Sequence, residues 1–277
     1  MRLEELFSPR WAGGWAASRV LFVFAALSAH LPRLGQIQDA AQHPSVVLTA
    51  GPMRLVEQAV LSGPQAMGLW AIGCLGLGAL LVGGRAAKPG LLIWLVSHYP
   101  MIILAGLSAR VPERMFLWVA LALLMAPISE RGLTEKARSP APRWLLLLVA
   151  CALYGSPGWL KATMEPAWWT GEALAYDLVD RNFGLKPVGV WLSGQPGLTR
   201  LMSWGTILIE ASFPFLIWWR RSNPWILLAA AGMHLGIELM MEVKALSFLT
   251  LAMYPVLLHP EVAQRLWRRC RDILRLS

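Results

Sequence analysis

Residues 144–174 read WLLLLVACALYGSPGWLKATMEPAWWTGEAL, and they join an apolar run to a dense polar and aromatic segment. An apolar run of this kind predicts a membrane-crossing helix. The run ends at Lys161, and acidic residues and tryptophans follow it closely. A lysine in an aromatic collar at the end of a span is either an interfacial anchor or part of a functional site.

The rest of the chain shares this apolar character. Hydrophobic residues make up 56% of the 277 residues and charged residues only 15%, whereas soluble domains carry about a quarter charged residues. The shortfall extends along the whole sequence, which indicates an integral membrane protein with the lipid bilayer as its partner. The net charge is +9, but the basic residues lie in short clusters between apolar runs, which argues against nucleic acid as a partner.

Eight apolar stretches predict the fold, which is an all-α polytopic bundle of about eight transmembrane helices in a domain spanning residues 1–259. The fourth and eighth are short for a straight span, so they are either tilted partners or partial spans. The stretches cover residues 15–32, 66–83, 89–109, 115–129, 144–160, 201–219, 224–242 and 245–259.

The basic residues also predict an orientation. With eight spans and the N-terminus inside, the cytoplasmic pieces hold 15 basic residues and the outer pieces hold 9. This bias places both termini in the cytoplasm, in what we expect to be a bacterial inner membrane, and it places residues 161–200 outside as a long loop. The basic tail, residues 260–277, is predicted to be an amphipathic surface helix or a plain positive anchor.

The glycines and the cysteines give structural predictions but do not indicate a catalytic or binding site. The glycines of GCLGLGALLVGG, residues 73–84, are typical of close helix packing and not of a nucleotide site. Cys74, Cys151 and Cys270 lie far apart, so they predict neither a disulfide framework nor a metal site. We therefore expect no metal.

Ionisable groups inside spans are costly and are therefore functional candidates. Lys161 ends the fifth stretch, and His98 and Glu210 lie in the middle of others. His234 and Glu238 are four residues apart, which places them on one helix face. Each also has a structural explanation: His98 can bond a neighbouring helix, Glu210 can organise a kink, His234 and Glu238 can satisfy one another, and Lys161 can anchor at the interface.

The segment YGSPGWLKATMEPAWWTGEAL, residues 154–174, resembles the signature of the horizontally transferred transmembrane domain family. That signature has Gly-x-x-Lys, then Trp, then Gly-x-Ala-Leu. The spans that contain Glu210 and His234 are similar to the family's Glu-x-x-x-Pro and histidine spans, and Arg19 matches an arginine near its opening. The resemblance covers most of residues 7–258.

The family includes the membrane part of vitamin K-dependent γ-glutamyl carboxylase, and this implies a chemistry. The resemblance implies that Lys161 is the base that deprotonates a reduced quinone, with oxygen and carbon dioxide as co-substrates, and that His98 assists. It also implies catalytic roles for Glu210 and His234. Substrate-binding residues are expected to be Trp168, Trp169, Glu172 and Glu238.

These observations favour a membrane enzyme with carboxylase-like lyase or quinol-dependent monooxygenase chemistry. Its substrate would be a quinol or another lipid-soluble molecule, and a peptide or protein substrate stays open as a further partner. The alternative is a non-catalytic membrane module that binds a lipid or a membrane protein and keeps its buried polar groups for packing. A transporter is less favoured, because the sequence shows no two-half symmetry with paired broken helices.

Overall fold

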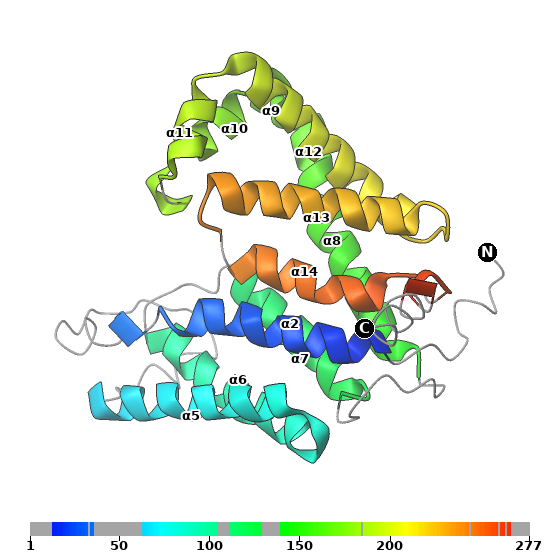
Figure 1. Cartoon of the computed structure of the whole chain (residues 1–277). Helices are drawn as coiled ribbons and strands as arrows, with labels where there is room; N and C mark the ends of the chain where they lie inside the picture. Colours follow the sequence, from blue (N-terminus) through cyan, green and yellow to red (C-terminus); the bar gives the residue numbers. More distant parts are fainter. Residues whose placement is uncertain are drawn as a thin grey trace, which may run out of the picture.

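Helix α8 (Ala141–Thr163) contains the apolar run and ends just beyond Lys161. Two prolines mark it: Pro142 lies in the first turn, where its missing N–H costs nothing, and Pro157 lies inside the helix. The computed structural model places α8 across the helix layers of the molecule (Figure 1). The structure describes residues 13–32, 34–35, 63–104, 111–128, 139–183, 185–243, 245–259, 261–263 and 265–266.

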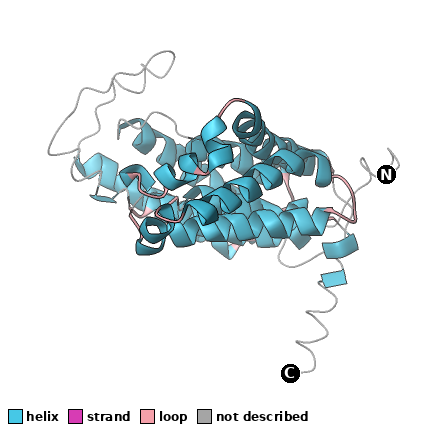
Figure 2. Ribbon diagram, turned by 90° about the horizontal axis from the view of Figure 1, so that it is seen from above, coloured by secondary structure: helices cyan, strands magenta, loops and turns pink. Residues whose placement is uncertain are grey.

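Each of the eight predicted apolar stretches is a helix, which confirms the all-α class. Besides α8, the long helices are α2 (Gly13–His30), α5 (Gly63–Val82), α6 (Ala87–Leu104), α7 (Val111–Met125), α12 (Pro196–Leu216), α13 (Asn223–Met240) and α14 (Ala245–Leu257). A short 3-10 turn, η1 (Gly84–Ala86), joins α5 to α6. Within the described residues there is no strand (Figure 2).

The membrane character has direct support in two of these helices. Pro64–Val82 in α5 and Ala141–Thr163 in α8 are long and apolar enough to cross a bilayer, among the residues the structure describes. Arg114–Met125 and Ala245–Leu257 are shorter apolar helices. The count of eight spans therefore stays a prediction.

Some helix pairs that pack together are neighbours in the sequence, and others are far apart in it. Extensive contacts join α5 to α6, α2 to α14, and α8 to α12. In the α5–α6 hairpin, a Cβ added at Gly76 would lie 2.7 Å from the carbonyl oxygen of Gly90, and one added at Gly90 would lie 2.6 Å from that of Gly76. This confirms the predicted close helix packing for Gly76, whereas no atom lies within 4 Å of the Cβ position at Gly78.

Two groups of buried apolar side chains form the core. The larger group lies among the long helices and includes Phe22, whose ring meets Trp94 and Phe116 edge to face at centroid distances of 5.3 and 5.6 Å. The smaller group lies beside the Lys161 end of α8 and includes Trp168 and Ile207. This second group fixes the segment that follows α8, which is why the structure there differs from an open loop.

Residues 161–200, predicted as a long outer loop, contain short helices. They are α9 (Pro166–Thr170), α10 (Glu172–Asp177), the 3-10 turn η2 (Arg181–Phe183) and α11 (Pro187–Ser193). A proline begins α9, α11 and α12, where its fixed φ favours the first helical turn. Gly171 separates α9 from α10 with φ of 86°, a left-handed conformation that favours glycine.

The basic tail predicted as a surface helix lies largely outside the described residues, which there include 261–263 and 265–266, both helical. Glu261 forms an exposed ion pair with Arg220, with 2.7 Å between Oε2 and an Nη atom. The first twelve residues also lie outside the described part of the chain.

Candidate functional site

Lys161 and Glu210 form the central ion pair of the site. The Lys161 ammonium donates to both carboxylate oxygens of Glu210, at 2.8 Å each. The two side chains are mostly buried, with exposed fractions of 17% and 10%. Because two oxygens hold one ammonium in a sheltered place, the pair has better geometry than a surface salt bridge.

Glycines on α8 make this pairing possible, because they let α12 approach closely. A Cβ added at Gly158 would lie 2.5 Å from the backbone nitrogen of Ala211 and 2.6 Å from the carbonyl carbon of Glu210. One turn earlier, a Cβ at Gly155 would lie 2.7 Å from the Pro214 ring. Gly155, Gly158 and Lys161 recur every three residues, so they lie along the side of α8 that faces α12.

Replacing Gly158 by alanine is expected to destabilise the protein by about 1–3 kcal/mol, the usual cost of overpacking a close contact. The added methyl group would meet backbone atoms of α12, which cannot rotate away. Gly205→Ala is the matched control on α12, since no atom lies within 4 Å of the Cβ position at Gly205. Thermal unfolding in a neutral detergent should show a lower midpoint for Gly158→Ala alone, and equal midpoints would contradict the close approach.

The two tryptophans that follow Lys161, Trp168 and Trp169, differ in burial. The Trp168 ring is 8% exposed, and the Lys161 ammonium lies 4.3 Å from its centroid, in a cation–π contact. Trp169 is exposed, and its indole N–H donates to the carbonyl of Ala162 at 2.9 Å. The Trp204 indole on α12 donates to the Trp169 carbonyl at 2.9 Å, which ties α9 to α12.

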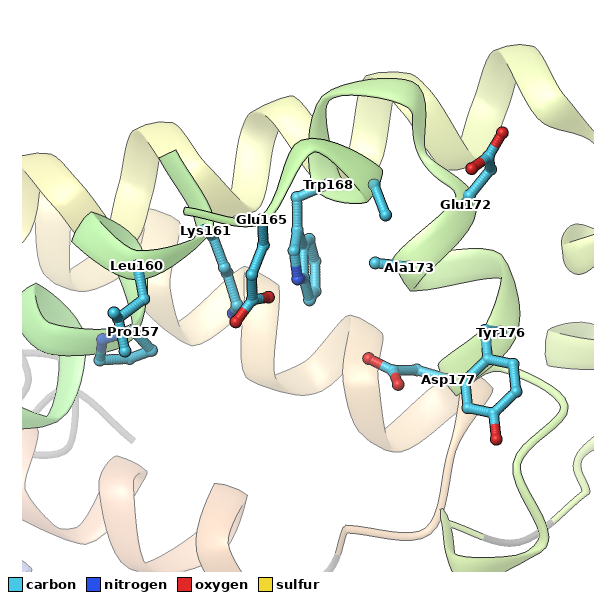
Figure 3. Close-up of a pocket in the computed structure, with 10 residues that line it drawn as sticks. Pro157, Leu160, Lys161, Glu165, Trp168, Glu172, Ala173, Tyr176 and Asp177 are labelled. Atoms are coloured by element: carbon cyan, nitrogen blue, oxygen red, sulfur yellow. The ribbon is translucent and has the colours of Figure 1, made fainter. Parts of the chain in front are cut away.

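A cavity of about 540 Å³ opens beside this cluster, between the end of α8 and helices α9 and α10. Its volume lies within the range of small-molecule sites. Figure 3 shows the Asp177 carboxylate facing the side of the cavity where Lys161 and Trp168 lie. The cavity is lined by Pro157, Leu160, Lys161, Glu165, Ala167, Trp168, Glu172, Ala173, Tyr176 and Asp177.

Asp177 lines the cavity although it was not a candidate from the sequence. Burial raises the pKa of its carboxyl group above the usual value, Lys161 acts in the opposite direction, and the carboxylates of Asp180 and Glu165 add to the rise. The Asp177 side chain makes no hydrogen bond or ion pair with the described residues, while its backbone carbonyl accepts from the Asp180 N–H. Its carboxylate is therefore available to a molecule inside the cavity.

The remaining predicted substrate-binding acids lie in different surroundings. Glu172 is exposed and lines the cavity, with its carboxylate directed away from Lys161 (Figure 3). Glu238 lies on α13 outside the cavity lining, and its Oε1 is buried without a hydrogen bond to any described residue. The Lys186 ammonium reaches the backbone carbonyl of Glu238, not its carboxylate.

His234 belongs to a second polar cluster, on the core side of the ion pair. The Tyr154 hydroxyl shares a hydrogen bond of 2.8 Å with His234 Nε2 and another with the Tyr254 hydroxyl. His234 Nδ1 lies 3.4 Å from Ser247 Oγ. His234 therefore bonds Tyr154 and Ser247, and not the acid one turn away on its own helix.

His98 lies in a third place, within the larger core. It is fully buried, its Nδ1 lies 3.4 Å from His30 Nδ1, and its ring stacks on Trp94 at 4.5 Å. Helix α6, which carries His98, lies at the opposite end of the molecule from α9 and α10 in Figure 1. The structure thus brings together Lys161, Glu210 and Trp168, with Glu172 at the same cavity, but it does not bring His98 to them.

Sequence reasoning missed several members of these clusters, among them Asp177 and Tyr154. Asp177 follows the quoted segment by three residues and lies on α10, which begins after the left-handed turn at Gly171. Its carboxylate faces the side where Lys161 lies (Figure 3). Tyr154 begins the quoted segment and lies seven residues before Lys161, which is the spacing of one helix face and was the available signal. Among the described residues, no group of three or more histidine, cysteine or acidic side chains is arranged to hold a metal.

A comparison with protein-family models matches residues 114–261 to the HTTM domain. The match covers just over half of the chain and includes α8, α12, α13 and the whole Lys161 cavity. The chain belongs to the HTTM domain family. HTTM is a membrane domain associated with vitamin K-dependent carboxylase, which agrees with the resemblance found in the sequence. No curated protein and no solved structure matches the chain significantly.

Proposed function

We propose that this HTTM domain is a membrane enzyme related to vitamin K-dependent γ-carboxylase, in which Lys161 acts as a base toward a quinol or another lipid-soluble substrate. The observation that carries the proposal is the position of Lys161. Its ammonium lies at the wall of a cavity of ligand size, held by Glu210 on one side and the Trp168 ring on the other. A lysine placed only as an interfacial anchor needs neither partner.

Glu210 gives the lysine a way to become a base. Lys161 can accept a proton only after its ammonium group has released one. The carboxylate oxygens of Glu210, which would take that proton, lie 2.8 Å from Nζ. Transfer to Glu210 leaves a neutral amine beside the cavity. The amine then takes the proton of a substrate hydroxyl, so that the hydroxyl becomes an oxyanion next to the ammonium.

The cavity suits a substrate with a flat ring. Trp168 and Tyr176 supply aromatic surface, and Pro157, Leu160 and Ala173 supply apolar surface. The Lys161 nitrogen is the group that would meet a ring hydroxyl. A reduced quinone, when bound, would supply the hydroxyl to be ionised, and oxygen and carbon dioxide are the co-substrates that the family relationship suggests.

The alternative of a non-catalytic membrane module has less support. A packing scaffold should pair every buried charge and leave no cavity, because an unpaired buried charge costs several kcal/mol. In the described part of the chain, Lys161 is paired with Glu210, but a cavity adjoins this pair. The cavity favours a site over a scaffold.

The positive-inside bias predicts an orientation in the membrane. We expect eight spans in a bacterial inner membrane, both termini in the cytoplasm and the Lys161 cavity on the outer side. Alkaline phosphatase and green fluorescent protein fusions after residues 138 and 186 should report opposite sides, with position 186 outside. The same side at both positions would overturn the orientation of the cavity.

Quinol-dependent oxygen uptake tests the proposed reaction. Membranes that contain the protein should consume oxygen on addition of reduced vitamin K or another quinol, above the rate of membranes without it. Uptake equal to that of the control membranes for every quinol tested would remove quinol oxygenation from the proposal.

A further inference from the structure

The charge of the cavity beside Lys161 points to the kind of molecule that binds with the quinol. We infer that the cavity binds an organic cation, a primary or quaternary ammonium group on a short apolar chain, and that it disfavours an acidic side chain. The inference rests on the cavity of the proposed function, and it names the class of the second substrate. Its test measures binding and requires no turnover.

Lys161 does not make the cavity positive, because its charge is already balanced. Both oxygens of Glu210 bind its ammonium at 2.8 Å, and the pair together is neutral. The other charged lining residues are three carboxylates, those of Glu165, Glu172 and Asp177. The Glu172 carboxylate is directed away from Lys161 (Figure 3), so Glu165 and Asp177 supply the excess negative charge in the part of the cavity beyond Lys161. That part attracts a cation and repels a glutamyl carboxylate, whereas an oxyanion formed at Lys161 lies next to the ammonium.

Carboxylates alone would not define a site, but the structure also shows how this place holds an ammonium group. The Lys161 nitrogen lies between the Glu210 carboxylate and the face of Trp168, 4.3 Å from the ring centroid. Across the cavity, the Asp177 carboxylate and the Tyr176 ring come from adjacent positions on α10. A second ammonium there would meet the Asp177 carboxylate, and Tyr176 adds an aromatic ring to the same lining.

The size and access of the cavity suit such a ligand. Its volume of about 540 Å³ exceeds that of a small ammonium head, so an apolar chain also fits. Glu165 and Tyr176 are exposed, which gives access from the surface, whereas Pro157 and Ala173 supply apolar wall. The Asp177 carboxylate has no hydrogen bond or ion pair with the described residues, so its charge is available to a ligand.

The cavity should lose its cation as Asp177 gains a proton. The charged groups that interact with Asp177 are Lys161 from α8, Glu165 from the α8–α9 connection and Asp180 from the turn after α10. Since the pKa of Asp177 is raised by burial, protonation begins at a higher pH than for an ordinary carboxyl group. Affinity for the cation should therefore be greatest near neutral pH and should fall as the pH is lowered.

Calorimetric titration of the purified full chain in a neutral detergent tests the inference. The probes are pentyltrimethylammonium, hexanoate as an anion of similar length, and dihexanoylphosphatidylcholine as a lipid source of the same ammonium. We expect the ammonium to bind and hexanoate not to bind. Tighter binding of the phosphatidylcholine would identify a lipid headgroup as the source, and tighter binding of the free ammonium would identify a soluble amine.

Variants connect the binding to the cavity. Asp177→Asn should weaken ammonium binding about tenfold, the loss of one strong contact, and Glu165→Gln, at an exposed position, serves if Asp177→Asn fails to fold. Glu261→Gln, an exposed acid paired with Arg220 outside the cavity, should change the affinity less than twofold. The inference is overturned if hexanoate binds as well as the ammonium, if neither binds, or if all three variants bind alike. Quinol-dependent oxygen uptake is measured separately, so such a result would leave the proposed function to be decided by that assay.

Discussion

Lys161→Arg should fold and insert like the wild type and lose at least about two orders of magnitude in activity, the usual scale for a general base. Arginine preserves the charge, and its forked guanidinium can still bind both oxygens of Glu210. What it cannot do is release a proton at any accessible pH. The change therefore separates a base from an anchor, since an anchor needs only charge and reach. The readout is quinol-dependent oxygen uptake per unit of protein in membranes.

Lys186→Arg is the matched control for this substitution. Lys186 is another lysine of the segment after α8, and its ammonium bonds a backbone carbonyl of α13 outside the cavity. We expect this variant to keep full activity. Equal rates for the wild type and Lys161→Arg would show that Lys161 is not the base and that the tryptophans form only an interfacial belt.

Glu210→Leu should have the largest effect on stability. It would leave the Lys161 ammonium, 17% exposed, without its bidentate partner. Breaking a buried pair on one side costs about 3–5 kcal/mol in proteins generally, because an uncompensated charge remains. We expect about 3 kcal/mol here, since part of Lys161 reaches solvent, and thermal unfolding in detergent measures it.

The double variant Lys161→Met/Glu210→Leu distinguishes the effect of losing the ion pair from the effect of losing side-chain packing on α12. Replacing a buried pair by apolar side chains of similar size is often neutral for stability. The double variant should therefore recover most of the unfolding midpoint that Glu210→Leu loses, and it should have no activity. If both variants were equally unstable, Glu210 would stabilise α12 through packing and not through Lys161. If Glu210→Leu alone proved more stable and fully active, the acid would have no part in the site.

The helices could be predicted from the sequence because their signal is local. Each apolar stretch defines a helix, and the glycines of residues 73–84 predicted the close α5–α6 contact that Gly76 makes. Residues 161–200 could not be predicted in the same way. Helices α9, α10 and α11 are five to seven residues long, which is too short for a periodic pattern, and prolines and Gly171 set their ends.

The candidate residues could be named from the sequence, but their pairings in the structure could not. Lys161 and Glu210 come from different apolar stretches, and their pairing depends on a contact between α8 and α12 across 49 positions. The small residues Gly155 and Gly158 were a signal for that contact, since they precede Lys161 at three-residue intervals. His98 and His234 lie in separate clusters because their partners, His30 and Tyr154, come from other helices.

The measurement that tests the central claim most directly is photolabelling of the protein in membranes with a diazirine-bearing quinol, followed by mapping of the labelled peptides by mass spectrometry. If the Lys161 cavity is the active site, the label should fall within residues 157–177, and an excess of unmodified quinol should remove it. Label confined to α5 and α6 around His98, or label that competing quinol does not reduce, would contradict the assignment of this cavity as the substrate site.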